Sequence, residues 1–271
     1  MPISAPEKMR PLRSVRIGRL PFPLPPFLGL LTLILLAAPF ATLVFATHWA
    51  EFHFAPGDAG AIGVSLFYSL VSLPIIICLG TPMAWWLARY EFPAKWAVDG
   101  VLLVALLTPP LATGILLTSL YGPYGSVGEL LERLGLELTN SAPAFILAQV
   151  YGAMPYYVLS ARAAFEGVPR ELEQIALTLG KEPWQVFRQI SLPLAQLGLA
   201  AGVALAWVRA LGEFGIVLII AYYPQGIPVK LWVNLQDIGL AAVYPLLWLF
   251  FVVALPLPLY LGILSRRRMA L

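Results

Sequence analysis

Charged side chains are scarce in this chain of 271 residues: they make up 11% of it, whereas 60% of the residues are hydrophobic and the mean hydropathy is +0.83. A soluble globular chain carries roughly 25% charged residues, so the composition excludes a soluble enzyme built around one large core. The single cysteine, Cys78, excludes an internal disulfide framework and a cysteine-based zinc or iron–sulfur cage. The composition therefore indicates an integral membrane protein.

Patterns for catalysis and metal binding are also lacking. The phosphate loop G-x-x-x-x-G-K-[ST] does not occur, so we do not expect this chain to hydrolyse ATP. His48 and His53 flank Glu51 in the first predicted external loop, without the ordered framework that a metal site needs. Ser, His and Asp side chains do not assemble into a triad on one side of the membrane. We expect no catalytic residue, no metal and no nucleic-acid partner.

Long intervals without charge predict the membrane topology. About 20 apolar residues of helix cross the roughly 30 Å hydrocarbon core, and five intervals can each hold one such helix. A further interval crosses only if it tolerates Arg209 and Glu213 within it. The expected fold class is an all-α polytopic membrane protein, a single transmembrane domain over 27–271. Its six transmembrane helices are predicted near 27–47, 61–88, 100–121, 143–165, 194–222 and 241–264.

The distribution of lysine and arginine predicts the orientation, because basic residues are enriched in cytoplasmic loops. Only Arg133 and Lys230 lie in the loops of one side, so this side is expected to be external and both termini cytoplasmic. A cleaved signal peptide is the alternative for the start of the chain, but its apolar run is too long for an h-region. We therefore predict a basic cytoplasmic segment over 1–26. The basic residues on the cytoplasmic side are Lys8, Arg10, Arg13, Arg16, Arg19, Arg89, Lys95, Arg162, Arg170, Lys181, Arg188, Arg266, Arg267 and Arg268.

The cytoplasmic segment 166–191 is one of the two longest predicted connections, and its pattern predicts two short amphipathic helices. Pro169 and the nearby acidic residues suit the start of the first helix, and Gly180 suits its end. A second helix is expected from about Pro183. Such a pair could lie on the lipid surface or form a compact knob for a partner. The first helix has Leu172, Ile175, Ala176 and Leu179 on one face, and the second has Trp184, Phe187 and Ile190 on one side.

This segment resembles the coupling loop of binding-protein-dependent ABC importer permeases, whose pattern is Glu-Ala-Ala, three residues, Gly, nine residues and Ile-x-Leu-Pro. Here Gly180 is followed by nine residues and then by Ile190-Ser191-Leu192-Pro193. The first triplet departs from the pattern, since Gln174-Ile175-Ala176 replaces Glu-Ala-Ala and Glu173 lies one place earlier. Stretches at 107–110, 160–166 and 209–215 resemble the sulfate, molybdate and tungstate permeases, and related iron and thiamine permeases share part of the last one.

The resemblance implies that the loop docks on a cytoplasmic ATPase. The implied partners are a second permease subunit, expected to be identical although a homologue stays open, two ATP-binding cassette ATPases, an external substrate-binding protein and the lipid bilayer. ATP and Mg would be bound by the ATPases, and no cofactor by this chain. The implied coupling residues are Glu173, Gln174, Ala176, Gly180, Trp184, Val186, Phe187, Ile190 and Pro193.

Polar residues inside the predicted spans are candidates for the translocation path or its gate. Arg209 and Glu213 are four residues apart, which places them on one helix face, and ionisable groups at membrane depth face the protein interior or a pore. They either brace the fold or offer Arg209 to an anion. Proline in mid-helix kinks the axis, and nearby hydroxyls either bond back to the helix or line a polar channel. The candidates in the third span are Thr108, Pro109, Pro110 and Thr113.

The expected function is that of a permease subunit in the prokaryotic cytoplasmic (inner) membrane, which forms the path of an ABC importer for molybdate, tungstate or sulfate. An ABC permease for iron or thiamine is one alternative. A secondary transporter or channel that works without ATP is another, although it would predict repeated broken helices at the midplane, and no repeat stands out.

Overall fold

The computed structural model describes residues 24–269, and all of its regular elements are helical: no β-strand occurs among these residues. The chain divides into two compact units, residues 1–47 and 48–271. Residues 1–23, which hold most of the predicted basic segment, lie outside the described residues. The all-α fold class predicted from the sequence is confirmed, whereas the side on which the termini lie stays a prediction.

The first unit contains one helix, α1 (Leu24–Ala46), where a span was predicted over 27–47. Its segment Pro26–Ala46 has a mean hydropathy of 2.4 and buries almost none of its side chains within the chain. Apolar surface of this extent is stable only in lipid or against another protein, so α1 has the properties of a membrane-crossing helix.

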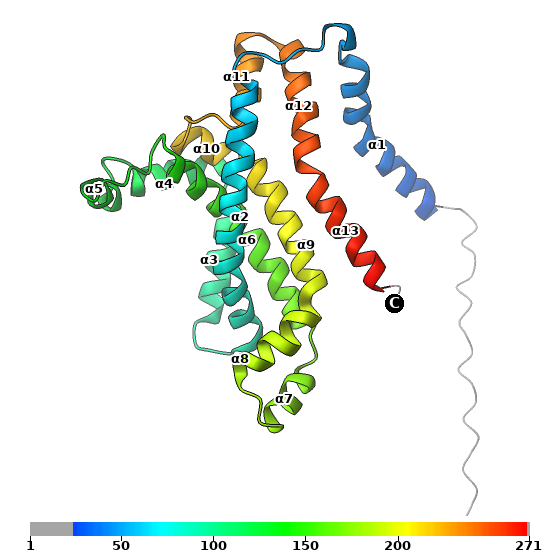
Figure 1. Cartoon of the computed structure of the whole chain (residues 1–271), viewed down its shortest axis with the longest axis vertical. Helices are drawn as coiled ribbons and strands as arrows, with labels where there is room; N and C mark the ends of the chain where they lie inside the picture. The colour runs from blue at the N-terminus through cyan, green and yellow to red at the C-terminus, as the bar shows by residue number, and fades with distance from the viewer. Residues whose placement is uncertain (1–23, 270–271) are drawn as a thin grey trace, which may run out of the picture. The chain divides into compact units, whose positions relative to one another are not determined.

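The core of the second unit is formed by three long helices, α2 (Asp58–Arg89), α6 (Ala142–Glu166) and α9 (Leu192–Leu211), which run together in Figure 1. Small side chains at their contacts allow the backbones to approach closely, as in membrane helices generally. Gln149 crosses this core: its amide accepts from Ser72 and donates to Ser69 and to the carbonyl of Ala210. The buried small residues of the three helices include Gly80, Ala84, Ala88, Ala153, Ala161, Gly202 and Ala206.

The third predicted span, 100–121, is not one helix. It consists of α3 (Lys95–Leu107) and α4 (Pro110–Tyr121), whose axes differ in direction by 112°. A residue before proline is restricted to extended backbone, and Thr108 and Pro109 both precede one; their ψ angles are 125° and 138°. The proline pair therefore breaks the helix instead of kinking it.

The fifth predicted span, 194–222, is also interrupted. Helix α9 ends at Leu211, and after Gly212, Glu213 and Phe214 the short helix α10 (Gly215–Ile220) begins. At its other end, α9 continues backwards through a π-helical turn (Phe187–Ser191) into α8 (Pro183–Val186). The prediction therefore started this helix too far along the sequence and missed its interruption.

The remaining elements are a 3₁₀ turn (Trp49–Glu51), α5 (Ser126–Arg133), α7 (Arg170–Thr178), α11 (Ile227–Asp237), α12 (Leu240–Ala254) and α13 (Pro256–Met269). Five apolar helical segments of the described chain are long enough to cross a membrane, namely 26–46, 58–89, 142–166, 183–220 and 240–264. The bent pair of α3 and α4 gives a sixth crossing if it counts as one span.

Candidate functional site

The loop between α6 and α9 forms the predicted pair of short helices, at the lower end of the second unit in Figure 1. Helix α7 ends at Thr178, and Gly180 follows it with a φ of +82°, a left-handed conformation that favours glycine. The N–H of Gly180 donates to Leu177 O at 3.0 Å, and that of Lys181 donates to Ala176 O at 3.1 Å. These two bonds close the last turn of α7, so the chain reverses sharply and begins α8 three residues later.

An ion pair holds α7 to the end of α2. Arg89 donates from Nε and Nη2 to Oε1 of Glu173, at 3.0 and 2.8 Å, and Ser191 Oγ donates to the same oxygen at 2.6 Å. The side chains of Arg89 and Glu173 are 7% and 13% exposed, so solvent screens this contact little. Arg170 adds a bond from Nη2 to the carbonyl of Ala88 at 3.0 Å. Glu173 thus joins three segments, α2, α7 and the π-helical turn before α9.

The second short helix is rigidly continuous with α9. Glu182 and Gln185 form a reciprocal capping box at the start of α8, and the helical backbone then runs without a break into α9. Ile190 lies in the π-helical turn and Pro193 in the first turn of α9. The loop and α9 are therefore joined by unbroken helical backbone.

The predicted coupling residues divide into a buried and an exposed set. Ala176 and Val186 are 6% and 5% exposed, and Phe187 packs its ring against Trp85 and Phe165. Their contacts are therefore within the chain, where Val186 and Phe187 were expected to contact a partner. Gly180 lies in open space. The exposed predicted residues, which can contact a partner, are Gln174, Gly180, Trp184 and Pro193. Ile175 and Leu179, which were not predicted as coupling residues, are exposed beside them.

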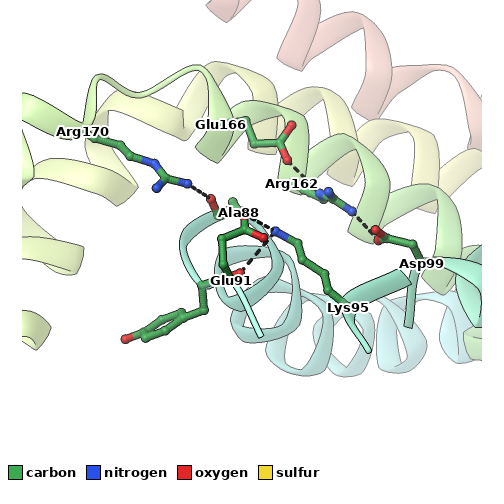
Figure 2. Close-up of polar contacts among 8 residues, drawn as sticks. Ala88, Glu91, Lys95, Asp99, Arg162, Glu166 and Arg170 are labelled. Atoms are coloured by element: carbon green, nitrogen blue, oxygen red, sulfur yellow. Dashed lines mark hydrogen bonds and ion pairs between the residues drawn. The ribbon is translucent and has the colours of Figure 1, made fainter. Parts of the chain in front are cut away.

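A second polar cluster lies beside this loop, where α2, α3 and α6 end or begin (Figure 2). Arg162 forms ion pairs with Asp99 of α3 and, through Nε at 2.8 Å, with Glu166. Lys95 Nζ lies 2.9 Å from Oε1 of Glu91, and this contact lowers the pKa of the Glu91 carboxyl below its usual value. The cluster ties α3 to α6, so the helices around the loop form one connected body.

Arg209 and Glu213, predicted on one helix face, lie on either side of a helix end. Glu213 follows the end of α9; its side chain is fully buried, pairs with Arg209 and accepts at Oε1 the N–H of Ile216 in α10, at 2.9 Å. A side chain on Gly152 of α6 would collide with this carboxylate, since an added Cβ would lie 2.5 Å from Oε2. The Arg209 side chain is 25% exposed and its guanidinium lies 5.6 Å from the ring centre of Tyr156.

The hydroxyl groups of Thr108 and Thr113 bond to their own helices. Thr108 donates to Val104 O at 2.6 Å and Thr113 to Pro109 O at 3.4 Å. Both residues line an apolar cavity of about 530 Å³ in the angle between α3 and α4. The lining is almost entirely apolar, so these residues suit packing better than a polar channel. Among the described residues, no group of three His, Cys, Asp or Glu side chains is placed to hold a metal ion.

The family follows from a comparison of the whole sequence with known families. The model of the binding-protein-dependent transport system inner membrane component matches residues 76–269, which include α6, the loop and α9. The chain belongs to this family. The family named from the loop pattern is therefore confirmed, and the protein is an ABC importer permease of the inner membrane.

Named relatives of this permease are permease proteins of molybdenum and sulfate transport systems. A probable molybdenum ABC transporter permease protein of Haloferax volcanii is 39% identical over 67% of this chain and 66% of its own length. A molybdenum transport system permease protein of Azotobacter vinelandii is 34% identical over 60% of this chain and 73% of its own length. The sulfate transport system permease protein of Escherichia coli K12 is 33% identical over 71% of this chain and 69% of its own length.

A solved structure shares the fold of this permease. A chain in the crystal structure of a bacterial alginate ABC transporter, in complex with an alginate pentasaccharide-bound periplasmic protein, matches with a TM-score of 0.71 and 19% identity. The match covers 90% of this chain and 93% of that chain. At this identity the likeness concerns the fold alone.

Sequence reasoning missed several residues that build the loop site of this permease. Arg89, Arg170 and Ser191 were not among the predicted coupling residues, although Arg89 and Arg170 were counted for the orientation and Ser191 stands in the loop pattern. Charged residues at span ends on the same predicted side of the membrane are a signal for such contacts, because they lie at the same depth and can pair. Glu173 was named, but its partner Arg89 is 84 positions away in the sequence, and spacing alone does not reveal that pair.

Proposed function

We propose that this permease forms the translocation path for a tetrahedral oxyanion, molybdate or tungstate, with sulfate as the nearest alternative. The named relatives for molybdenum and sulfate support this substrate class, as does a molybdate/tungstate transport system permease protein of Thermococcus kodakarensis, 32% identical over 69% of this chain. An external binding protein would deliver the ion, and a separate ATPase would drive transport.

The loop between α6 and α9 is the observation that supports an ATP-driven mechanism. It presents exposed apolar side chains, Ile175, Leu179 and Trp184, on a knob that Glu173 fastens to α2. An exposed apolar patch on a rigid element is typical of a protein contact. The partner would be an ATPase subunit, which would bind ATP and Mg²⁺, whereas this chain would bind no cofactor.

Alternating access follows if the knob moves as one body. Closure of two ATPases on ATP would shift two knobs, one on each copy of the permease in a homodimer, and the continuous helix 183–211 would transmit the movement to the Glu213 break. The break joins α9 to α10 and lies against α6 through Gly152. Arg209 is the basic side chain at this place that could meet an anion. Its pairing with Glu213 favours a bracing role, with weak contact to a passing ion.

The experiment begins with the tagged full chain, purified from native membranes in mild detergent and analysed by mass spectrometry. We expect an ATPase with a phosphate-binding loop to co-purify, and no second kind of permease. The complex is then reconstituted in liposomes with its binding protein added outside, and uptake of labelled molybdate, tungstate and sulfate is measured with and without ATP inside.

We expect ATP-dependent uptake of molybdate or tungstate, and we expect excess sulfate to inhibit this uptake only weakly. Uptake of another class of substrate would leave the importer function standing but overturn the oxyanion as its substrate. Uptake without ATP, together with no co-purifying ATPase, would overturn the coupling role of the loop and favour a secondary transporter.

A further inference from the structure

A small cavity lies between the end of α2 and the loop; Arg89 and Glu173 of the loop site line it, but no ligand has been assigned to it above. Its volume is about 280 Å³, slightly below the roughly 300–1,000 Å³ typical of small-molecule pockets. This volume suits one polar group of a larger ligand better than a whole nucleotide. The cavity is lined by Trp85, Arg89, Tyr90, Arg170, Glu173 and Ser191, together with side chains of α7 and α8.

Hydrogen-bond donors predominate among the polar side chains of this cavity. The indole N–H of Trp85 is buried and has no hydrogen-bond partner among the described residues, and a buried donor without a partner is unfavourable. Arg170 donates one bond, to the carbonyl of Ala88, and forms none of the ion pairs found between described residues. Arg89 is neutralised by Glu173, so the lining carries one net positive charge.

The cavity lies where α2 reaches the end of its apolar span. Exposed aromatic side chains surround this end: Trp86 is 40% exposed and stacks on Phe92, and Tyr90 and Trp96 are 49% and 79% exposed. Trp and Tyr gather at the depth of lipid headgroups, and basic pockets between helices at this depth bind anionic headgroups. A phosphate group offers acceptor oxygens and the matching charge.

We propose that this cavity binds a phosphate group, with Arg170 as the charged contact and Trp85 as a neutral donor. The source can be the headgroup of an anionic phospholipid or free inorganic phosphate, and the position at the membrane interface makes the lipid the first to test. A bound headgroup would link α2, α7 and α8 and stabilise the loop. This inference does not depend on which ion the permease transports.

The test is native mass spectrometry of the purified full chain, equilibrated with an equal mixture of phosphatidylglycerol and phosphatidylcholine. The wild-type chain is expected to retain phosphatidylglycerol preferentially. Arg170→Gln should lower this preference about fivefold, the effect of one basic residue at an anionic membrane surface, and Arg170→Lys should largely restore it. Trp85→Phe, which keeps the ring but removes the N–H, should lower it by a smaller factor.

Matched controls lie close by. Arg188→Gln changes the same charge on the same loop, and Trp86→Phe removes the indole N–H of the neighbouring residue, yet neither residue lines the cavity; both should behave as wild type. In a second arm, inorganic phosphate is added: displacement of the lipid, or a phosphate adduct lost in Arg170→Gln, assigns the site to free phosphate. Equal retention of both lipids with no phosphate adduct would overturn the proposal, as would equal losses in Arg170→Gln and Arg188→Gln.

Discussion

At the scale of single residues, variants of Gly180 distinguish the effect of the loop backbone from the effect of the loop surface. Its left-handed conformation costs any other L-residue about 1–2 kcal/mol, but a Cβ there meets no atom within 4 Å. Gly180→Ala and Gly180→Arg therefore share the same backbone cost. Only arginine also places a long charged side chain beside Leu179, on the surface proposed to meet the ATPase.

We predict that Gly180→Arg inserts in the membrane normally but lowers ATP-dependent uptake at least about tenfold, a loss of about 1.4 kcal/mol or more in coupling. Gly180→Ala should retain most of the uptake. The uptake rate and the ATPase activity of each variant are measured in the reconstituted complex. Equal loss in the two variants would attribute the effect to the backbone, and unchanged uptake in Gly180→Arg would remove Gly180 from the contact.

Glu213 has two separable roles, as the partner of Arg209 and as the acceptor for the N–H of Ile216 in the first turn of α10. Glu213→Ala removes both roles. Removing one partner of a buried pair costs about 3–5 kcal/mol, and the partial exposure of Arg209 places the expected loss of stability near the lower value. Glu213→Gln keeps an acceptor for Ile216, so it should lose less.

The stability of these two variants is measured by thermal unfolding in detergent, and Glu213→Gln should unfold between wild type and Glu213→Ala. The double variant Arg209→Met/Glu213→Gln also removes the unpaired charge, so it should be more stable than Glu213→Gln alone. If the double variant were the least stable of the set, repair of an unpaired charge would not be the reason. Uptake by stable variants then tests whether Arg209 also acts in transport.

At the scale of elements, the sequence predicts where helices lie better than where they break. The spans over α2 and α6 were placed within three residues at each end, because charged residues mark where lipid stops. The interruption at Gly212–Phe214 was missed because its apolar neighbours continue the pattern. Its cause is a contact: the Glu213 carboxylate replaces the missing helix bond at Ile216, and Gly152 of another helix leaves the space for it.

The break between α3 and α4 has a local cause that can be tested. Each proline restricts the residue before it, so Pro109→Ala or Pro110→Ala alone leaves one extended residue and should retain the bend. The double variant should form a continuous helix. Spin labels at Val101 and Leu120, in a chain with Cys78 replaced, would then be about 28 Å apart along 19 residues at 1.5 Å each.

The same labels should be much closer in the wild type and in both single variants, as measured by pulsed electron paramagnetic resonance. A short distance in the double variant would contradict the local explanation. It would mean that the packing of α4 on α10, where Gly215 lies against Pro110, sets the bend by itself.

At the scale of the whole molecule, contacts between loops decide whether the bent pair crosses the membrane. Arg89 at the end of α2 touches Glu173 in the loop after α6, so both ends lie on one side of the bilayer. Helix α6, which leads into this loop, crosses the bilayer once. The chain from α3 to α5 must therefore also cross once, and a re-entrant loop that returned to its own side would place Arg89 and Glu173 on opposite sides.

Single cysteines test this topology together with the predicted orientation. In a chain with Cys78 replaced, we place one cysteine at Glu91, Tyr124 or Lys181, all of which are exposed. An impermeant maleimide applied to spheroplasts should label Tyr124→Cys at once, and Glu91→Cys and Lys181→Cys only after lysis, since most basic residues lie on the side of the latter two. Labelling of Glu91→Cys together with Tyr124→Cys would establish a re-entrant pair. Labelling of Glu91→Cys and Lys181→Cys without lysis would instead reverse the orientation. The loop would then lie out of reach of any cytoplasmic ATPase.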